Sequence, residues 1–487
     1  MALGKRKTQQ QERIWIEAAS LRRPASHPFY ERLNQILEEK KFDEFSELQS
    51  HKFYSEGTGR PGLAPGIYFR LLLIGYFEGI DSERGIAWRV SDSMSLRSFL
   101  EIGPDEATPD HSTISRTRRL IDMETHQSIF SWILEILGGR GLLKGNTVGV
   151  DATTLEANAA LRSIVHRRTG ESYEEFLKKL AEESGIETPT KEQLAKFDRK
   201  RKKKGGNKEW MNPFDPDAKI TKMKSGGTHM AHKAEHAVDL ETGAVVAVTI
   251  QHADLGDTTT MVETIAKAGE NIAGTASKVN NPKAGELLNP IGPAAVVADK
   301  GYHSNDVLIG LKQAQIRSYI SEPDRGKRRW DGKPEAKQAV YGNRRRIKGE
   351  NGKRLLDQRG EFVERSFAHV YETGGMRRTH LRGSENILKR VLIHVGAFNL
   401  GLVMRQLMGK GTPRGFQSGK AALNSLFPAL HFWLIEFPLI ARGRLNKITP
   451  ILHSQSNMSS ISNAIPYSFS SRIRAPLSWK IGLTTGC

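Results

Sequence analysis

Two short apolar runs each end in an aspartate, at positions from which a β-strand would deliver the acid to a reaction site. The run Thr147–Val150 precedes Asp151, and the run Ala294–Ala298 precedes Asp299. At the carboxyl edge of a sheet, side chains of adjacent strands can converge on one point. Carboxylates that converge repel each other unless a cation lies between them, and Mg²⁺ and Mn²⁺ prefer such oxygen ligands. With a third acid, the pair would hold two metal ions that stabilise the attacking and the leaving oxygen of a phosphodiester.

An aspartate after a strand is often only a turn residue or a helix cap, and either acid taken alone favours that simpler interpretation. The neighbouring residues favour chemistry. Gly301 would let a ligand approach the backbone beside Asp299, and Tyr302 offers an aromatic face that could stack on a base. Small residues follow Asp151, as a crowded metal site requires. By contrast, Asp257 is expected to cap a helix rather than to serve as a fourth ligand.

The charge of the chain points to a polyanionic partner. Its 73 Lys and Arg outnumber its 54 Asp and Glu, which gives a formal net charge of +19. Such an excess suits either nucleic acid or an acidic membrane surface. Residues 199–208 carry a net charge of +7 and residues 325–359 carry +9, so most of the excess lies in two segments around the candidate acids. This concentration favours nucleic acid, because the two segments would hold its backbone.

Several features argue against a secreted or membrane protein. Cys487 is the only cysteine, so the chain can form neither an internal disulfide nor a four-cysteine zinc site. The polar N-terminus lacks the apolar stretch of a secretory signal. The apolar stretch Val391–Met408 contains polar residues and is short for a bilayer, so a core helix is expected there. We therefore expect a soluble cytoplasmic protein with no membrane partner.

The N-terminal part of the chain is predicted to be helical. Residues 1–58 are expected to form a helical lead, residues 59–125 a helical DNA-binding domain, and residues 126–145 a connecting helix. Asp110 is placed to cap a basic helix of the second segment. Several short helices that end in a basic one suggest a helix-turn-helix-like DNA reader, and a helical bundle with a solvated basic face is an equally good interpretation. The arginines of the basic helix are Arg116, Arg118 and Arg119.

Residues 146–408 are predicted to form an α/β domain with a central sheet. Strands are expected at 147–150, 228–239, 244–250, 294–298 and 316–320. A Glu-Thr-Gly turn at 241–243 would join the second and third strands as a hairpin. Helices are expected from Asp257, after Asp299 and from Glu361 onward. This mixed order of strands and helices is typical of an α/β fold.

Two basic segments interrupt the predicted α/β domain. Residues 159–225 include an amphipathic helix at 173–180 and then a basic run, whereas residues 325–359 show no clear period. Beyond the domain, residues 409–487 combine an apolar patch with a Ser-rich stretch, and a poorly ordered C-terminal tail is predicted there.

Four motifs of the chain resemble those of bacterial insertion-sequence transposases of the DDE type. The segment Gly59–Arg119 is similar to the helical N-terminal domain of the InsH-like group of these enzymes. The resemblance covers roughly residues 20–405 and implies a ribonuclease-H-like catalytic domain. The three acidic motifs are Val148–Thr153, Ala298–Tyr302 and Val363–Phe367.

The resemblance implies that Asp151, Asp299 and Glu364 form a catalytic triad that holds Mg²⁺ or Mn²⁺, as two ions. The third acid is the least typical of the three. Related transposases carry the pattern Tyr-x2-Arg-x3-Glu-x6-Lys, and the companions of that pattern are missing around both Glu364 and the nearby Glu361. Glu364 is preferred because the Glu-Arg-x-Phe sequence at 364–367 looks like a subgroup variant. Both glutamates share one helix face, so both could approach the site.

By this resemblance the chain is a DNA transposase that binds the terminal inverted repeats of its element, cuts the strands and joins them to target DNA. Double-stranded DNA would be its partner, and a homodimer or a larger assembly would act on paired ends at the bacterial nucleoid. A transposase-derived protein that only binds DNA, and a nuclease that only hydrolyses it, are the alternatives. The candidate DNA contacts are Arg116, Arg118, Arg119, Lys202, Lys203, Tyr302, Arg344, Arg345, Arg346, Arg365, Arg377, Arg378 and Arg382.

A histidine cluster suggests zinc only weakly. In a strand, His232 and His236 would share one face and His229 would point to the other. Because no cysteine and no typical ligand spacing accompany them, a zinc site is not expected. Lys233, in the same segment, could touch DNA, but an exposed strand lysine is expected there.

Overall fold

The computed structural model describes residues 27–55, 62–186, 188–201, 205–223, 226–279, 288–324, 326 and 328–416. The chain divides into two units, Met1–Ser425 and Leu426–Cys487, and the described residues all belong to the first. Of the predicted tail, only 409–416 is described, and the 3-10 turn η6 (Pro413–Phe416) lies there. The prediction for the rest of the tail lies outside the described residues.

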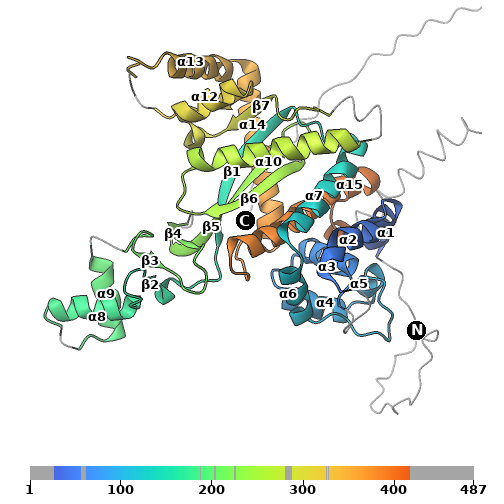
Figure 1. Ribbon diagram of the computed structural model, residues 1–487, viewed down its shortest axis with the longest axis horizontal. Coiled ribbons are helices and arrows are strands. Elements are labelled where there is room, and N and C mark those ends of the chain that lie inside the picture. Colours follow the sequence, from blue (N-terminus) through green and yellow to red (C-terminus); the bar gives the residue numbers. More distant parts are fainter. Residues whose placement is uncertain are drawn as a thin grey trace, which may run out of the picture. The chain divides into compact units, whose positions relative to one another are not determined.

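The described residues between Pro28 and Gly139 form a succession of helices (Figure 1). These helices are α1 (Pro28–Glu39), α2 (Phe42–Ser50), η2 (His51–Phe53), α3 (Pro65–Glu78), α4 (Glu83–Ser91), α5 (Met94–Phe99), α6 (His111–Leu120) and α7 (Met123–Gly139). Side-chain caps begin several of them, and Asp110 caps α6 as the sequence predicts, because its carboxylate accepts from the Ser112 N–H. Helix α3 is buried along most of its length and therefore lies at the centre of this part.

A mixed sheet follows these helices. Its strands are β1 (Thr147–Glu156), β4 (Lys219–Lys222), β5 (Thr228–Asp239), β6 (Val245–His252), β7 (Ala295–Ala298) and β8 (Arg317–Ile320). Strand β5 pairs antiparallel with β1, β4 and β6, and the parallel strands β7 and β8 continue the sheet on the other side of β1. The predicted hairpin between β5 and β6 is confirmed, and Gly243 takes the left-handed conformation that its turn needs (φ +78°).

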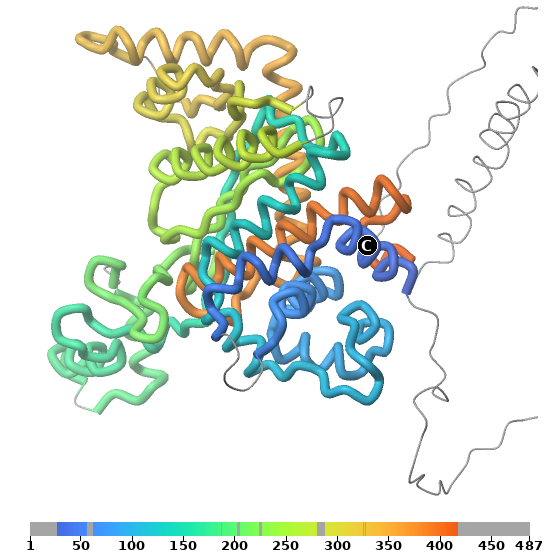
Figure 2. The backbone as a smooth tube through the Cα atoms, turned by 45° about the vertical axis from the view of Figure 1, so that its right-hand side comes forward, coloured from blue at the N-terminus to red at the C-terminus, as the bar shows by residue number. Residues whose placement is uncertain are grey.

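Helices cover both faces of the sheet. Successive side chains of a strand point to opposite faces. Glu235 of β5 bonds to threonines of α10 (Asp257–Lys278), whereas the next residue, His236, bonds to Ser366 of α14 (Glu350–Phe367). Helices α10 and α14 therefore lie on opposite faces. Figure 2 shows how α7 crosses α15 (Ser384–Met408), a contact between segments far apart in the sequence.

The first basic segment folds as a small separate part between β1 and β4. It contains the 3-10 turn η3 (Leu161–Ser163), the paired strands β2 (Val165–His166) and β3 (Trp210–Met211), and the helices α8 (Tyr173–Glu183) and α9 (Lys191–Lys200). The predicted amphipathic helix is confirmed as α8. Trp210 is buried and packs against the Phe176 ring, so its position favours a structural role.

The second basic segment differs from the prediction. Residues 325–359, for which the sequence showed no clear period, form α13 (Pro334–Lys348) and the first half of α14. The buried residues of α13 follow the helical spacing i, i+3, i+4, i+7. The sequence conceals this helical spacing because the buried residues are small or polar and lie among arginines and lysines. They are Ala336, Ala339, Val340 and Asn343.

The apolar stretch Val391–Met408 forms part of α15 and is a core helix, as predicted. By length and composition, Ser384–Phe416 could cross a membrane, but 89% of its most apolar window is buried inside the structure. Asn399 is fully buried and both donates to the Val245 carbonyl and accepts from its N–H. These bonds fasten α15 to β6, which is a contact that a lipid-facing helix would not make.

Candidate active site

The two candidate aspartates follow paired residues of neighbouring parallel strands. The register pairs Val150 of β1 with Ala298 of β7, and Asp151 and Asp299 come next along the chain. Asp299 follows the end of β7 as predicted, but the prediction that a strand ends at Asp151 is wrong, because β1 continues to Glu156 and Asp151 lies inside it. Asp299 also begins the 3-10 turn η4 (Lys300–Tyr302), because its Oδ1 accepts from the Gly301 N–H at 2.8 Å. The capping role that the sequence left open for Asp299 is therefore present, and it does not remove the acid from the edge of the sheet.

A further carboxylate lies at the same edge. Asp257 is the first residue of α10, after the N-cap Gly256, rather than the cap that the sequence predicted. A Cβ placed on Gly301 would lie 2.6 Å from Asp257 Oδ2 and 3.1 Å from Asp299 Oδ1. Both carboxylates therefore lie against this glycine, and no larger residue would fit between them without displacing one of them.

Lys233 is buried beside these carboxylates and neutralises part of their negative charge. Its Nζ lies 2.6 Å from Asp257 Oδ1 and also donates to Thr260 Oγ1 at 2.9 Å. The side chain is 6% exposed, so the sequence-based expectation of an exposed strand lysine is wrong. A buried ammonium needs such partners because losing its hydration is costly.

Tyr302 is buried beneath the Asp299 turn. Its hydroxyl donates to Glu235 Oε1 at 2.8 Å, and Glu235 also accepts from Thr260 and Thr264 of α10. Burial raises the pKa of Glu235, and these hydrogen bonds oppose that shift. Burial and the nearby carboxylates raise the pKa of Tyr302 well above its ordinary value. With a fully buried side chain, Tyr302 does not present the base-stacking face that the sequence suggested; it anchors the turn that carries Asp299.

We expect Tyr302→Phe to lower the free energy of unfolding by about 1–3 kcal/mol, because it removes one bond from a buried carboxylate. Urea denaturation followed by circular dichroism measures the change. The matched control is Tyr341→Phe, since that side chain is 44% exposed and should change stability by less than about 0.5 kcal/mol. Equal stabilities of the two variants would contradict the anchoring role.

Helix α14 crosses the sheet behind Asp151. Arg359 faces β1, and its Nη1 lies 2.7 Å from Asp151 Oδ2. At about 100° per residue, Glu364 lies roughly 140° around the helix from Arg359 and on the same side as Phe367. Phe367 contacts His236, the residue that pairs with Asp151 across β1 and β5. Phe367 is buried whereas Glu364 is exposed, so Glu364 lies on the flank of α14 rather than against the sheet.

The two candidate glutamates, Glu361 and Glu364, are both exposed on α14. Glu361 pairs with Arg365 one turn later on the exposed surface of α14. Glu364 is also exposed. Within the part of the chain that the structure describes, no three His, Cys, Asp or Glu side chains are grouped closely enough to hold a metal ion together. The structure therefore brings Asp151 and Asp299 together with Asp257 nearby, and it leaves the third acid on the flank of α14.

His236 ties α14 to the sheet beside Asp151. Its Nδ1 lies 2.9 Å from Ser366 Oγ, and its Nε2 lies 2.7 Å from the Tyr371 hydroxyl. Burial lowers its pKa to about 3, so the ring is neutral. Tyr371 lies in a π-helical turn (Ala368–Thr373) directly after α14, a feature often found at functional sites. The sequence presented this histidine only as a weak zinc candidate, and its role depends on partners far along the chain.

The N-terminal arginines divide into one structural and two exposed residues. Arg118 is 6% exposed and bonds to Glu83 and Asn386, so it joins α6 to α4 and α15 and is not placed to contact DNA. Arg116 and Arg119 are exposed on the same helix. Their bonds go only to oxygens of the preceding turn, so they stay available to a phosphate.

The candidate arginines of the catalytic part have different surroundings. Arg344 donates twice to Glu322, two residues after β8, and Arg346 donates to the Ser318 carbonyl of β8, so both hold α13 to this part of the chain, while Arg345 is exposed. Arg365 pairs with Glu361. Lys202 and Lys203 lie outside the described residues.

Three further arginines follow the π-helical turn. Arg377 donates to Thr153 Oγ1 at 2.9 Å, two residues after Asp151, and so joins this loop to β1. Arg378 is 63% exposed beside Glu156. Arg382 donates to the Asn158 carbonyl and lies over the Phe214 ring. All three lie beside the far half of β1, so a DNA strand along that half would meet them.

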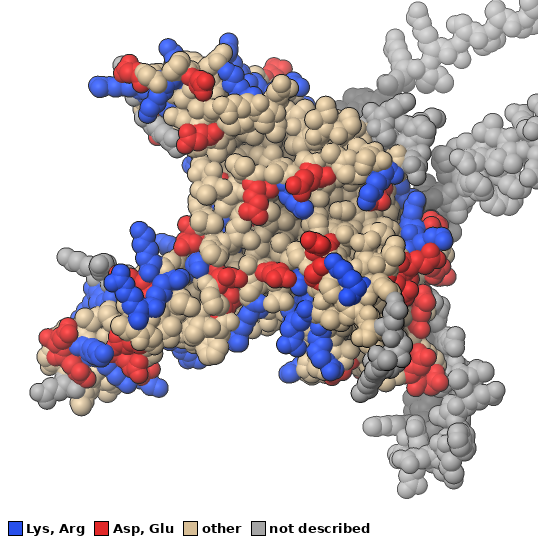
Figure 3. Space-filling model, in the orientation of Figure 1, with Lys and Arg blue, Asp and Glu red and all other residues tan. Residues whose placement is uncertain are grey.

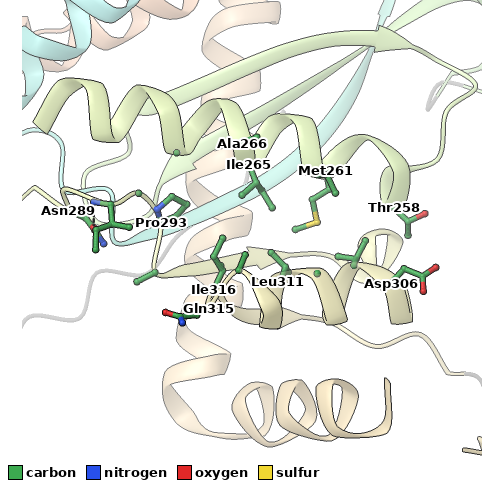
Figure 4. A pocket seen from close by; sticks show the side chains of 18 residues that line it. Thr258, Met261, Ile265, Ala266, Asn289, Pro293, Asp306, Leu311, Gln315 and Ile316 are labelled. Carbon is green, nitrogen blue, oxygen red and sulfur yellow. Dashed lines mark hydrogen bonds between the residues drawn. The ribbon is translucent and has the colours of Figure 1, made fainter. Parts of the chain in front are cut away.

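A separate pocket of about 660 Å³ lies between α10 and α12 (Asn305–Gln313) (Figure 4). Side chains such as Met261, Ile265 and Leu311 make its lining apolar, and Asp306 is the only charged residue of the lining. A pocket of this kind offers nothing that would hold a phosphate, so it is distinct from the edge with the carboxylates.

Comparison with known families matches two parts of the chain. Residues 18–120 match the family described as "Transposase domain (DUF772)", and residues 196–400 match the family described as "Transposase DDE domain". Asp299 and Glu364 lie within the second match, and Asp151 lies before it. Neither a search of curated proteins nor a search of solved structures returned a match.

Proposed function

We propose that this chain, two parts of which match transposase families, is a DDE transposase that binds the terminal inverted repeats of its element and catalyses metal-dependent cleavage and transfer of DNA strands. The observation that supports the catalytic step most directly is the register that makes Asp151 and Asp299 neighbours at one edge of the sheet. The strand order β4-β5-β1-β7-β8, with β6 also paired to β5, joins antiparallel pairs on one side of β1 to parallel pairs on the other and suits a ribonuclease-H-like fold.

Members of the DDE family use divalent metal ions, and the residues present suit such ions. Asp151 and Asp299 follow paired residues of neighbouring strands, and carboxylate oxygens are the ligands that Mg²⁺ and Mn²⁺ prefer. Asp151, Asp299 and Glu364 would hold Mg²⁺ or Mn²⁺, as two ions. Bound ions of this kind polarise a phosphodiester and stabilise the attacking and leaving oxygens.

The side chains around the acids would keep them in place during the reaction. Tyr302 and Glu235 fix the turn that carries Asp299, and His236 fixes α14, which carries Glu364.

The basic surfaces would hold DNA. Figure 3 shows Lys and Arg over the part that contains α13 and over the part that contains α8 and α9, with a hollow between them at whose edge α10 begins. A homodimer or larger assembly would hold both ends.

The deciding experiment incubates the purified chain with Mg²⁺ and duplex DNA that carries the element's ends, and resolves the products on a denaturing gel. We expect strand cleavage at the ends and joining to a target plasmid, both abolished by EDTA and by Asp151→Asn. Cleavage without joining would instead indicate a nuclease. Binding without cleavage, unchanged in Asp151→Asn, would indicate a DNA-binding protein that no longer cuts.

We expect the double variant Arg116→Ala, Arg119→Ala to weaken binding to DNA without unfolding the chain, because both side chains are exposed. Loss of two phosphate contacts should reduce the slope of log K against log salt by about 2. Fluorescence anisotropy at several salt concentrations measures this slope. Arg32→Ala, at a half-buried arginine of α1, is the control. An unchanged slope in the double variant would remove α6 from the DNA interface.

A further inference from the structure

Arg359 has only one charged partner in the described part of the chain, and that partner is the central acid of the site. Its Nη1 lies 2.7 Å from Asp151 Oδ2, and the side chain is 16% exposed. The Nε is buried and has no hydrogen-bond partner. A charge-assisted bond to one carboxylate oxygen therefore holds the guanidinium in place.

A glycine of β1 makes room for this arginine. Gly149 lies two residues before Asp151, on the same face of the strand. A Cβ at this position would lie 3.1 Å from Arg359 Cγ and 2.7 Å from Leu240 Cδ2. The absence of a side chain at Gly149 lets the arginine stem lie flat on the strand and reach the acid.

We propose that Arg359 and a divalent cation compete for Asp151 Oδ2, so that metal binding displaces the guanidinium. This inference rests on the metal site under the proposed function. Oδ1 of Asp151 already accepts from the Ala152 N–H at 2.8 Å, and Oδ2 is the oxygen that bonds to Arg359. A cation at ligand distance from Oδ2 would be only a few ångströms from the guanidinium, and two positive charges repel strongly at that separation.

Lys233 has more bonding partners than Arg359, so Arg359 rather than Lys233 is the residue that moves when a cation binds. Lys233 bonds to Asp257, to Thr260 and to the Leu255 carbonyl, so a cation at Asp257 would leave it two other partners. Arg359 loses its one ion pair when the cation arrives. The freed guanidinium is a bidentate donor for phosphate, so it would pass from the acid to the DNA backbone that the same cation binds.

The test measures Mn²⁺ affinity of the full-length chain without DNA, by electron paramagnetic resonance of free Mn²⁺. We expect Arg359→Gln, which keeps most of the side-chain volume, to bind Mn²⁺ about tenfold more tightly than the wild type, the factor that corresponds to one lost charge-assisted bond. Arg359→Ala should show the same gain, and Arg359→Lys should stay near the wild type because the charge is kept. Arg365→Gln is the control on the same helix, since Arg365 pairs with Glu361.

Two outcomes overturn the inference, and they differ in what they say about the metal site. If Asp151→Asn removes Mn²⁺ binding but both neutral Arg359 variants bind as the wild type does, or more weakly, the metal site stands and the competition is refuted. If Asp151→Asn leaves Mn²⁺ binding unchanged, no metal is held by Asp151, and the proposed active site fails together with the inference. Circular dichroism of each variant confirms that the fold is kept.

Discussion

Glu364→Gln is expected to slow metal-dependent DNA cleavage on the order of a thousandfold, because a metal ligand that stabilises developing charge supplies several kcal/mol to the transition state. Glutamine has nearly the same shape but no charge, so it should leave the exposed surface of α14 unchanged. Glu364 is exposed on the flank of α14, the helix that contacts β1 through Arg359. The measurement is the single-turnover rate on DNA that carries the element's ends.

Glu361→Gln is the matched control for this prediction. Glu361 lies one turn earlier on the same exposed helix and pairs with Arg365, so its loss removes only a surface ion pair. Surface pairs contribute little to stability, and we expect a rate within about threefold of the wild type. If Glu361→Gln slows cleavage strongly and Glu364→Gln does not, Glu361 is the third acid. If neither changes the rate, the third ligand lies elsewhere, and Asp257 would then be the residue to replace.

The second prediction concerns the effect of acidic pH on the stability of the fold. Burial lowers the pKa of His236 to about 3 from its ordinary value of 6.5. Between these values the unfolded chain binds a proton that the folded chain does not, so stability falls as the pH is lowered below 6.5. From pH 6.5 to pH 5, this residue alone should lower the free energy of unfolding by about 2 kcal/mol. Urea denaturation at closely spaced pH values measures the slope.

His236→Gln isolates the contribution of this residue. The variant should be less stable at pH 7, because the bonds to Ser366 and Tyr371 are altered, and its stability should fall less steeply between pH 6.5 and pH 5. Burial lowers the pKa of His126 to about 4, so that residue continues to contribute in both proteins. Parallel profiles of wild type and His236→Gln would contradict a buried neutral histidine.

Local patterns were enough to predict much of the fold. The hairpin between β5 and β6, the cap at Asp110, the helix α8 and the strands that lead to Asp151 and Asp299 all follow from short stretches of sequence. Each depends on turn residues, caps or apolar periodicity within a few positions. The segment 325–359 shows the limit of this approach, because small buried residues among many charges concealed the period of α13.

The roles of individual side chains were predicted less well than the strands that carry them. Tyr302 and Lys233 were expected at the surface, and both are buried beneath the acids. Arg118 was expected to contact DNA, and it joins α6 to Glu83 and to Asn386, which lies 268 positions further along the chain. A basic or aromatic residue has the same chemistry in both settings, so its type alone does not reveal its partner.

By itself, the sequence was enough to predict that apolar strands lead to two aspartates, that three acidic motifs resemble those of DDE transposases, and that positive charge is concentrated in two segments. Only the tertiary structure decided which cation lies against each acid, with Arg359 at Asp151 and Lys233 at Asp257. The physical reason is the range of the interactions. Strand and turn propensities act over a few residues, whereas the Arg359–Asp151 pair joins groups 208 positions apart, which only the packing of α14 on the sheet brings together.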